Sequence, residues 1–169
     1  KGFIHSADAV DLSQKTGAVF SNGRAYRYAL WRSWKTKPYV LFVGLNPSTA
    51  DEKTDDRTVG RCKRFAKDWG YGSVCVVNLF AFRATKPKCM RAAIDPIGSD
   101  NDQWLRCLAK HAGVIVCAWG ADGGYENRDR DVISLLSEYG PLKCLGVTKD
   151  GKPRHPLYLK ADTQLEDFK

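Results

Sequence analysis

The sequence predicts an α/β protein: a three-layer α/β/α sandwich with a central, mainly parallel four-stranded sheet and an added N-terminal β-hairpin. Two observations carry this prediction. Four short runs are continuously apolar, which is typical of strands buried on both faces of a parallel sheet. The stretches between them carry apolar residues at helical spacing, and strands that alternate with such helices are joined by right-handed crossovers.

The N-terminal hairpin is predicted from Asn22-Gly23, which lies between two strand-like runs within residues 17–36. Asn and Gly accept the positive φ angles that a two-residue hairpin turn requires. The run after the turn alternates between apolar and more polar residues, which is typical of a strand with one buried face.

The four apolar runs are the predicted strands of the sheet, and they cover residues 39–44, 73–78, 113–119 and 142–147. After the first of them, Val59, Cys62 and Phe65 recur at helical spacing, and two later stretches show the same period. With 169 residues, of which 43% are hydrophobic, the chain can fill one core. We therefore expect a single domain over residues 1–169.

Composition limits the compartment and the partners. Lys and Arg outnumber Asp and Glu by 27 to 19, so a formal charge of +8 should attract polyanions such as nucleic acid, or serve only solubility. Six cysteines are spread without a C-x-x-C pair, which argues against a zinc site or a disulfide framework. The apolar runs are far shorter than the ~20 residues of a membrane span. We expect a cytoplasmic monomer with no metal, no cofactor and no membrane partner.

Polar residues follow the predicted strands where each strand ends. Gly44 and Asn46 follow the first strand, Asn78 ends the second, and His155 follows the fourth. In open parallel sheets, ligands bind at the carboxyl ends of the strands. We therefore expect these side chains to share one edge of the sheet and one site.

Four stretches at this edge resemble motifs of the uracil-DNA glycosylase superfamily, over residues from about 39 to 159. They are "GLNPS" (44–48), "VCVVNLFAFR" (74–83), "VIVCAWG" (114–120) and "RHPLYL" (154–159). Within that superfamily, the wording looks most like a bacterial and phage family of unknown function that carries the motif Leu-Asn-Pro-Ser-Thr-Ala. The resemblance implies a uracil-DNA glycosylase-like fold.

The resemblance also implies a hydrolase that cleaves the N-glycosidic bond of a modified or mismatched pyrimidine in DNA. It implies that Asn46 orients the attacking water, that His155 faces the base oxygen, and that Asn78 reads the pyrimidine edge. The remaining base-binding residues would be Gly44, Leu45, Pro47 and Phe80. The target base would be flipped out of a duplex or already single-stranded, because the pocket cannot reach a stacked base.

The chemistry explains why these residue types fit. Breaking the bond builds positive charge on the sugar and negative charge on the base. The amide oxygen of Asn46 could hold a water, whereas Asp at this position is expected to activate it more strongly. His155 could donate to the departing base oxygen. Asn78 offers one donor and one acceptor, which fits a uracil-like edge or a cytosine edge.

Charged and polar residues near these motifs would contact the rest of the ligand. Those expected at nucleic-acid phosphates are Ser48, Arg61, Arg64, Arg83, Lys86 and Arg154. Asp51 and Asp56 belong to an acidic segment, residues 51–56, that is foreign to an ordinary uracil pocket. They would contact sugar hydroxyls or a base substituent. Alternatively, Asp55 or Thr54 caps the following helix and the other carboxylates favour its dipole.

Each functional assignment has a plainer alternative. Asn46 could serve only the turn, Asn78 could cap its strand, and His155 could be solvated. Phe80 could pack under its loop, and the basic residues around Cys62 could form the wet face of a helix. The chain would then be a non-catalytic nucleic-acid or nucleotide binder. A further alternative is an enzyme that acts on free nucleotides or hypermodified bases.

Overall fold

A computed structural model describes residues 10–36 and 38–169, so residues 1–9 and 37 of the predicted domain lie outside this part. The strands are β1 (Thr16–Phe20), β2 (Arg27–Ser33), β3 (Tyr39–Gly44), β4 (Ser73–Asn78), β5 (Val114–Cys117), β6 (Leu142–Cys144) and β7 (Glu166–Asp167). The α-helices are α1 (Arg57–Asp68), α2 (Pro87–Arg91), α3 (Asn101–His111) and α4 (Arg128–Ser137). The described residues also form three short 3₁₀ helices, η2 (Asn22–Arg24), η3 (Ala121–Asn127) and η4 (Pro156–Tyr158).

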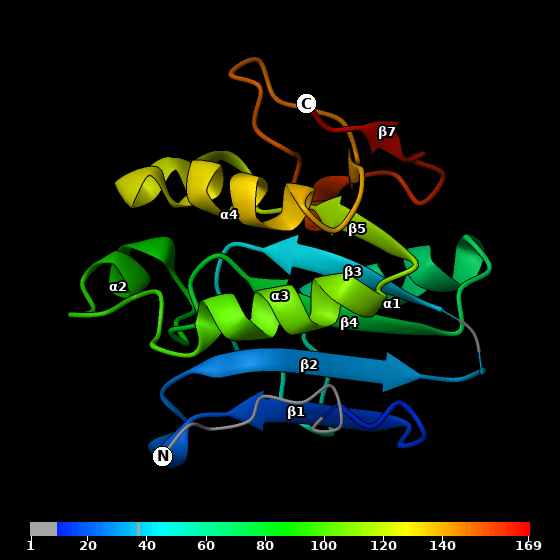
Figure 1. Ribbon diagram of the computed structural model, residues 1–169, viewed down its shortest axis with the longest axis horizontal. Helices are drawn as coiled ribbons and strands as arrows, with labels where there is room; N and C mark the ends of the chain where they lie inside the picture. Colours follow the sequence, from blue (N-terminus) through cyan, green and yellow to red (C-terminus); the bar gives the residue numbers. More distant parts are fainter. Residues whose placement is uncertain (1–9, 37) are drawn as a thin grey trace.

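The described strands form one mixed seven-stranded sheet in the order β1-β2-β4-β3-β5-β6-β7 (Figure 1). β3 pairs in parallel with β4 and β5, and β5 pairs in parallel with β6. The pairs β1–β2, β2–β4 and β6–β7 are antiparallel. The prediction of a mainly parallel four-stranded sheet is therefore wrong, because strands extend it in antiparallel pairing at both edges.

The N-terminal hairpin forms, but it continues the sheet instead of standing beside it. β1 and β2 pair across the turn at Asn22–Arg24, where Gly23 has a φ of 77°. β2 then pairs with β4 along its other edge. The expectation of one exposed face on this strand is wrong, because its polar residues Arg27 and Arg32 are only 2% and 3% exposed. β2 is thus buried on both faces, like an inner strand.

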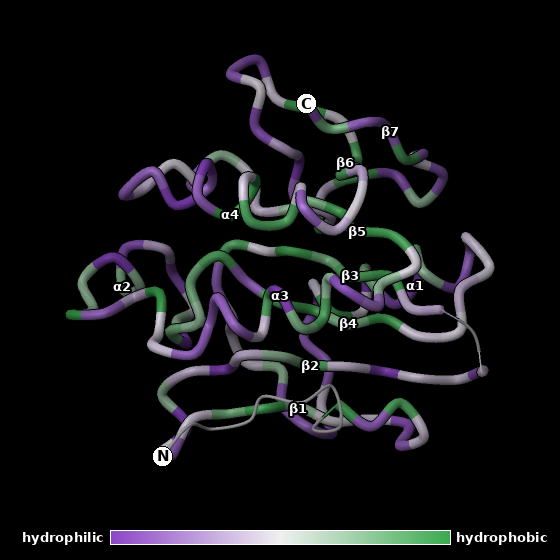
Figure 2. Tube along the Cα trace, viewed as in Figure 1, coloured by the Kyte–Doolittle hydropathy of each residue, from purple (hydrophilic) through white to green (hydrophobic). Residues whose placement is uncertain are grey.

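Helices cover both faces of the sheet. α1 packs on one face, where Val59 and Phe65 lie in a buried cluster with Phe42 of β3. α3 and α4 pack on the other face, where Trp104 and Leu136 join the larger cluster. In Figure 1, α3 lies in front of the strands and α1 behind them. Figure 2 shows the inner strands β3 and β5 as largely hydrophobic, as burial on both faces requires.

The parallel strands place their carboxyl ends at one edge of the sheet. The register sets Gly44, at the end of β3, opposite Asn78, at the end of β4. β5 ends beside them, since Val43 pairs with Cys117. Segments that are far apart in the sequence therefore meet at this edge. Among the described residues, no helix has the length and apolar character that a membrane crossing requires.

Candidate functional site

A cleft of about 580 Å³ opens at the carboxyl ends of β3, β4 and β5. The loop after β3, the first turn of α1 and the end of β4 form part of its wall. The segments around residues 84–87, 118–122 and 155–158 complete it. The cleft brings together Asn46, Asn78 and His155. Its volume is in the range of pockets that enclose a small molecule, which run from about 300 to 1,000 Å³.

Asn46 is held by the loops around it. Its Nδ2 donates to the carbonyl oxygen of Ala84 at 2.8 Å and to that of Pro47 at 3.2 Å. Both amide protons therefore have acceptors in the protein. The side-chain oxygen of Asn46 accepts no hydrogen bond from any described residue, so it is left for a water or a ligand.

Asn78 closes the inner end of the cleft. It is 4% exposed, and within the described part of the chain its Oδ1 has no hydrogen-bond partner. Its Nδ2 lies against Gly44, where a Cβ would come within 2.9 Å of it. Leaving a buried amide oxygen unpaired costs about 1–3 kcal/mol, so such groups call for an explanation. Because Asn78 lines the cleft, a turn of its amide group would bring this oxygen within reach of a ligand donor.

His155 is a half-buried residue at the start of η4. Its Nδ1 accepts a hydrogen bond from the backbone N–H of Leu157 at 3.2 Å, so the neutral ring carries its proton on Nε2. Burial lowers the pKa of His155 below the ordinary 6.5, and the charge of Asp56 only partly opposes this. At neutral pH the ring is therefore an uncharged donor through Nε2 in the wall of the cleft.

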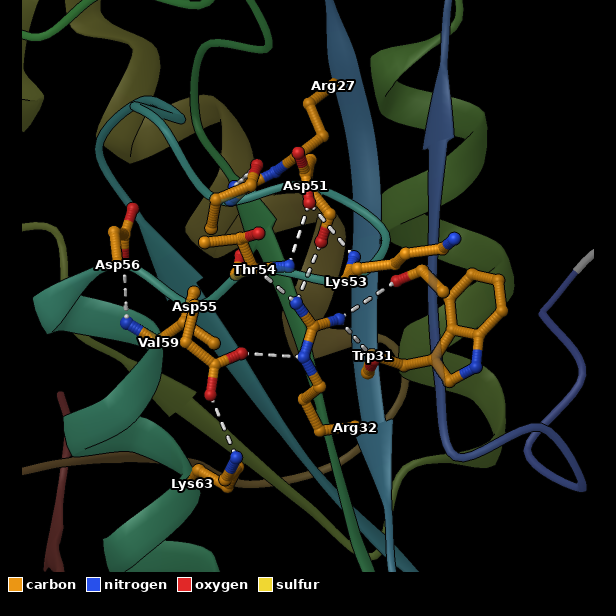
Figure 3. Close-up of polar contacts among 12 residues, drawn as sticks. Arg27, Trp31, Arg32, Asp51, Lys53, Thr54, Asp55, Asp56, Val59 and Lys63 are labelled. Atoms are coloured by element: carbon orange, nitrogen blue, oxygen red, sulfur yellow. Dashed lines mark hydrogen bonds and ion pairs between the residues drawn. The ribbon is translucent and has the colours of Figure 1, made fainter.

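Asp51 is occupied within the acidic segment. Its Oδ1 accepts hydrogen bonds from the backbone N–H groups of Lys53 at 2.9 Å and Thr54 at 2.8 Å (Figure 3). These bonds lower the pKa of Asp51. Asp51 is absent from the residues that line the cleft, whereas Glu52 pairs with Arg24 at 2.5 Å. Both side chains therefore shape the loop.

Asp56 caps α1 and also lines the cleft. Its Oδ1 accepts from the backbone N–H of Val59 at 2.8 Å (Figure 3). The prediction that Asp55 or Thr54 caps this helix is wrong by one or two residues. An N-cap carboxylate satisfies an otherwise unpaired N–H and favours the helix dipole. Asp56 is thus the member of the segment that a bound ligand can reach.

Asp55 forms an ionic bridge between the sheet and α1. It accepts from Nε of Arg32 at 2.7 Å and from Nζ of Lys63 at 2.8 Å (Figure 3). Burial alone would raise the pKa of Asp55, but the hydrogen bonds from Lys63 and Arg32 outweigh it and lower that pKa. The bridge therefore stabilises the fold at neutral pH. This stabilisation is lost as pH falls below 3.8 through the lowered pKa.

We predict that Asp55→Asn lowers the free energy of unfolding by about 2 kcal/mol at pH 7, because it leaves the buried Arg32 charge without its carboxylate. Asp68→Asn is the matched control, since Asp68 forms an exposed pair with Arg64 and should matter by less than about 0.5 kcal/mol. Urea denaturation measures both variants. Equal stabilities at pH 7 would contradict the role of Asp55.

Several predicted site residues lie elsewhere. Phe80 is fully buried in the core, 5.9 Å from the ring of Tyr125, and does not line the cleft. Arg61 donates to the carbonyl oxygens of Pro156, at 3.4 Å, and Leu159, and so ties α1 to the segment after His155. Phe80 fits its plainer alternative, and Arg61 supports the wall of the cleft from outside.

The other residues predicted to contact phosphates differ in their exposure and in the hydrogen bonds and ion pairs that they already make. Ser48 lines the cleft, as do Gly44, Leu45 and Pro47. Arg83 donates to the carbonyl oxygen of Arg24 at 3.2 Å. Arg154 is exposed and donates to the carbonyl oxygen of Val147 at 3.1 Å. Lys86 and Arg64 are exposed, and Arg64 pairs with Asp68.

Sequence reasoning missed other residues that line the cleft. Arg27 belongs to the alternating run after the Asn22-Gly23 turn, and no local pattern marks it as buried. Tyr158, at the mouth of the cleft, is 85% exposed, with its ring centroid 6.4 Å from that of His155. Its position three residues after His155 was a usable signal. Cys62 also lines the cleft, but burial raises the pKa of its thiol, which argues against a thiolate nucleophile.

The comparisons with curated proteins and with solved structures gave no match. One family model, described as "protein of unknown function (DUF1643)", matches residues 27–157. This range includes every residue named above in the wall of the cleft except Tyr158. The match agrees with the expectation that the chain belongs to a family of unknown function. The chain therefore belongs to the DUF1643 family of proteins of unknown function.

Proposed function

We propose that the cleft hydrolyses the N-glycosidic bond of a modified or mismatched pyrimidine, which DNA presents as a flipped or single-stranded nucleotide. The observation that carries this proposal is the meeting of Asn46, Asn78 and His155 in one cleft, where no described residue engages the side-chain oxygen of Asn46 or Nε2 of His155. The motif resemblance to the uracil-DNA glycosylase superfamily supports the same reaction.

In the proposed reaction, the side-chain oxygen of Asn46 accepts a hydrogen bond from the attacking water. The water oxygen bonds to C1′ of the sugar while the bond from C1′ to the base nitrogen breaks. The electron pair of that bond leaves with the base, which takes up one proton of the water. The products are a free base and a sugar with a hydroxyl group at C1′.

His155 would stabilise the departing base. Its Nε2–H is available because Nδ1 is engaged by Leu157, and its lowered pKa keeps the ring neutral. A preorganised donor aimed at a developing anion contributes about 3–4 kcal/mol to transition-state stabilisation in known enzymes. The ring needs no charge for this role, because the hydrogen bond strengthens as negative charge builds on the base oxygen.

Asn78 would select the base. Once the amide group turns toward the cleft, its unpaired oxygen would accept a ring or exocyclic N–H and its amide nitrogen would donate to a base oxygen or nitrogen. A uracil-like edge and a cytosine edge both satisfy this pair of groups. Burial makes the selection strong, since an analogue that lacks the matching group would leave the amide unpaired.

DNA is the proposed partner because of charge and exposure. The formal charge is +8, and the exposed Lys86 and Arg154 can contact phosphates without breaking an ion pair to a described residue. A collapsed cavity beside Asn46 would favour the alternative that the chain binds nucleic acid or a nucleotide without catalysing a reaction. The cleft beside Asn46 is instead open, with a volume of about 580 Å³, so it gives no such support to a binder without chemistry.

Mass spectrometry of released bases tests the proposal. The substrates are DNAs that carry uracil, thymine mismatches, and hydroxymethylated or glucosylated pyrimidines, with the corresponding free nucleotides as a separate arm. We expect release from at least one DNA, and none with a variant that lacks both Asn46 and His155. Release from free nucleotides alone would show that the substrate is a free nucleotide and not DNA. Absence of release from every substrate would refute the hydrolase.

A further inference from the structure

Arg27 is a buried cation in the wall of the cleft that the proposed reaction does not use. It is the first residue of β2 and is 2% exposed. Its Nη1 donates to the carbonyl oxygen of Ala50 at 3.1 Å, whereas its Nε has no partner among the described residues. In the part of the chain that the structure describes, no carboxylate forms an ion pair with it.

Charged groups of both signs lie around Arg27, but none of the described carboxylates forms an ion pair with it. Burial lowers the pKa of Arg27 to about 10, Asp56 opposes this shift, and Arg83 and Arg32 add to it. The guanidinium therefore stays charged at neutral pH. A buried charge without an ion-pair partner is strongly unfavourable, because the protein does not replace the lost hydration. A bound anion would supply the missing partner.

The first turn of α1 lies in the same wall. Arg57 and Thr58 are its first two residues, and both line the cleft. The N–H groups at these positions have no acceptor within the helix, and the helix dipole favours negative charge there. Asp56 takes the N–H of Val59 instead. Helix N-termini that combine free N–H groups with a cation bind phosphate groups.

We propose that Arg27 and the first turn of α1 bind the phosphate group of the nucleotide whose base enters the cleft. This proposal rests on the proposed function for the identity of the base. The phosphate belongs either to a free nucleotide or to a DNA strand, and the chemistry of recognition is the same for both. The Arg27 fork matches phosphate oxygens, and the hydroxyl group of Ser48 in the same cleft adds a donor.

Equilibrium binding of 2′-deoxyuridine, its 5′-monophosphate and inorganic phosphate tests the site by calorimetry. We expect the wild type to bind the monophosphate about 10- to 100-fold more tightly than the nucleoside, as hydrogen bonds to charged groups predict. Arg27→Met should remove this preference and leave the nucleoside affinity. Arg83→Met is the matched control, because Arg83 lies outside the cleft wall, and it should keep the preference.

Met fills the apolar volume of an arginine stem, so Arg27→Met should fold, and a thermal melt checks this. If it does not fold, Arg27→Lys serves, since it keeps the charge without the fork and should retain only part of the preference. Equal wild-type affinities for nucleoside and monophosphate would overturn the proposal. A preference that survives in Arg27→Met, or in Arg27→Lys at full size, would also overturn it.

A single-stranded oligonucleotide with one deoxyuridine distinguishes the two phosphate sources. Either source supports the site if Arg27→Met weakens its binding and Arg106→Met, at an exposed residue of α3 outside the cleft wall, does not. The base-release assay separates this proposal from the hydrolase. Arg27-dependent phosphate binding without base release would refute the hydrolase and support the phosphate site. Base release together with binding that is independent of Arg27 would support the hydrolase and refute the phosphate site.

Discussion

Replacing His155 with alanine is expected to lower kcat and kcat/KM together by about 10²- to 10³-fold, with DNA affinity nearly unchanged. The reason is that the Nε2–H interaction with the departing base forms chiefly in the transition state. Single-turnover rates and equilibrium binding on the substrate found by the base-release screen measure the two quantities. A loss of affinity with an unchanged rate would assign His155 to phosphate binding instead.

Two further variants distinguish the role of the Nε2–H donor of His155 from the role of its Nδ1 in local structure. His155→Asn places an amide oxygen near the position of Nδ1, so it can still accept from Leu157 N–H but lacks the Nε2 donor. It should be as inactive as the alanine variant and more stable. His155→Gln extends an amide N–H toward the Nε2 position and should recover part of the rate. Full activity in His155→Asn would contradict the donor role.

Acid should destabilise the wild type through His155. Its pKa in the folded state is lowered below 6.5, so the unfolded chain binds the proton first as pH falls. The stability that depends on the neutral ring is therefore complete above pH 6.5 and declines as pH falls through the window below it. Thermal melts across this window should show a smaller decline for His155→Asn. Parallel declines would contradict the shift.

Asn46→Ala is expected to remove most turnover, about 10²-fold or more, because the variant cannot orient the attacking water. It should also cost about 1 kcal/mol of stability, since the bond to the Ala84 carbonyl is lost. Thr49→Ala is a matched control, as Thr49 is exposed in the same loop and lines the cleft. A single-turnover rate equal to the wild type would contradict the role of Asn46.

The sequence and the structure predict opposite effects of Asn46→Asp on the reaction rate. Sequence reasoning expects a faster enzyme, because a carboxylate activates water better than an amide. In the structure, Nδ2 of Asn46 donates to two backbone carbonyls, which a carboxylate cannot do. The loop would lose both bonds and gain repulsion between oxygens. We therefore expect Asn46→Asp to be slower than the wild type.

The common edge of the candidate site was predictable from the sequence, whereas the sheet was not. Continuous apolar runs identify parallel strands, and parallel strands must place Asn46, Asn78 and His155 at one edge. The role of β2 was hidden because an alternating run predicts one exposed face, whereas Arg27 and Arg32, on opposite faces of the strand, are both buried. Their burial depends on carbonyl and carboxylate partners from the distant loop after β3.

The acidic segment shows a second limit. Asp51, Asp55 and Asp56 are equivalent candidates by composition, but each has a different partner in space. Backbone N–H groups hold Asp51, two cations hold Asp55, and Asp56 combines a helix cap with the cleft wall. Local sequence does not determine which carboxylate meets a cation from a distant strand. Tertiary pairing therefore decided which of the three a ligand can reach.

The most direct test of the central claim is a single-turnover reaction in H₂¹⁸O on the substrate identified by the base-release screen. Mass spectrometry then locates the label in the products. Hydrolysis of the N-glycosidic bond by water predicts an unlabelled base and, in samples taken before the C1′ hydroxyl exchanges with solvent, ¹⁸O at C1′ of the sugar. Label in the released base, or a wild-type reaction that leaves the base attached to the sugar, would contradict the account.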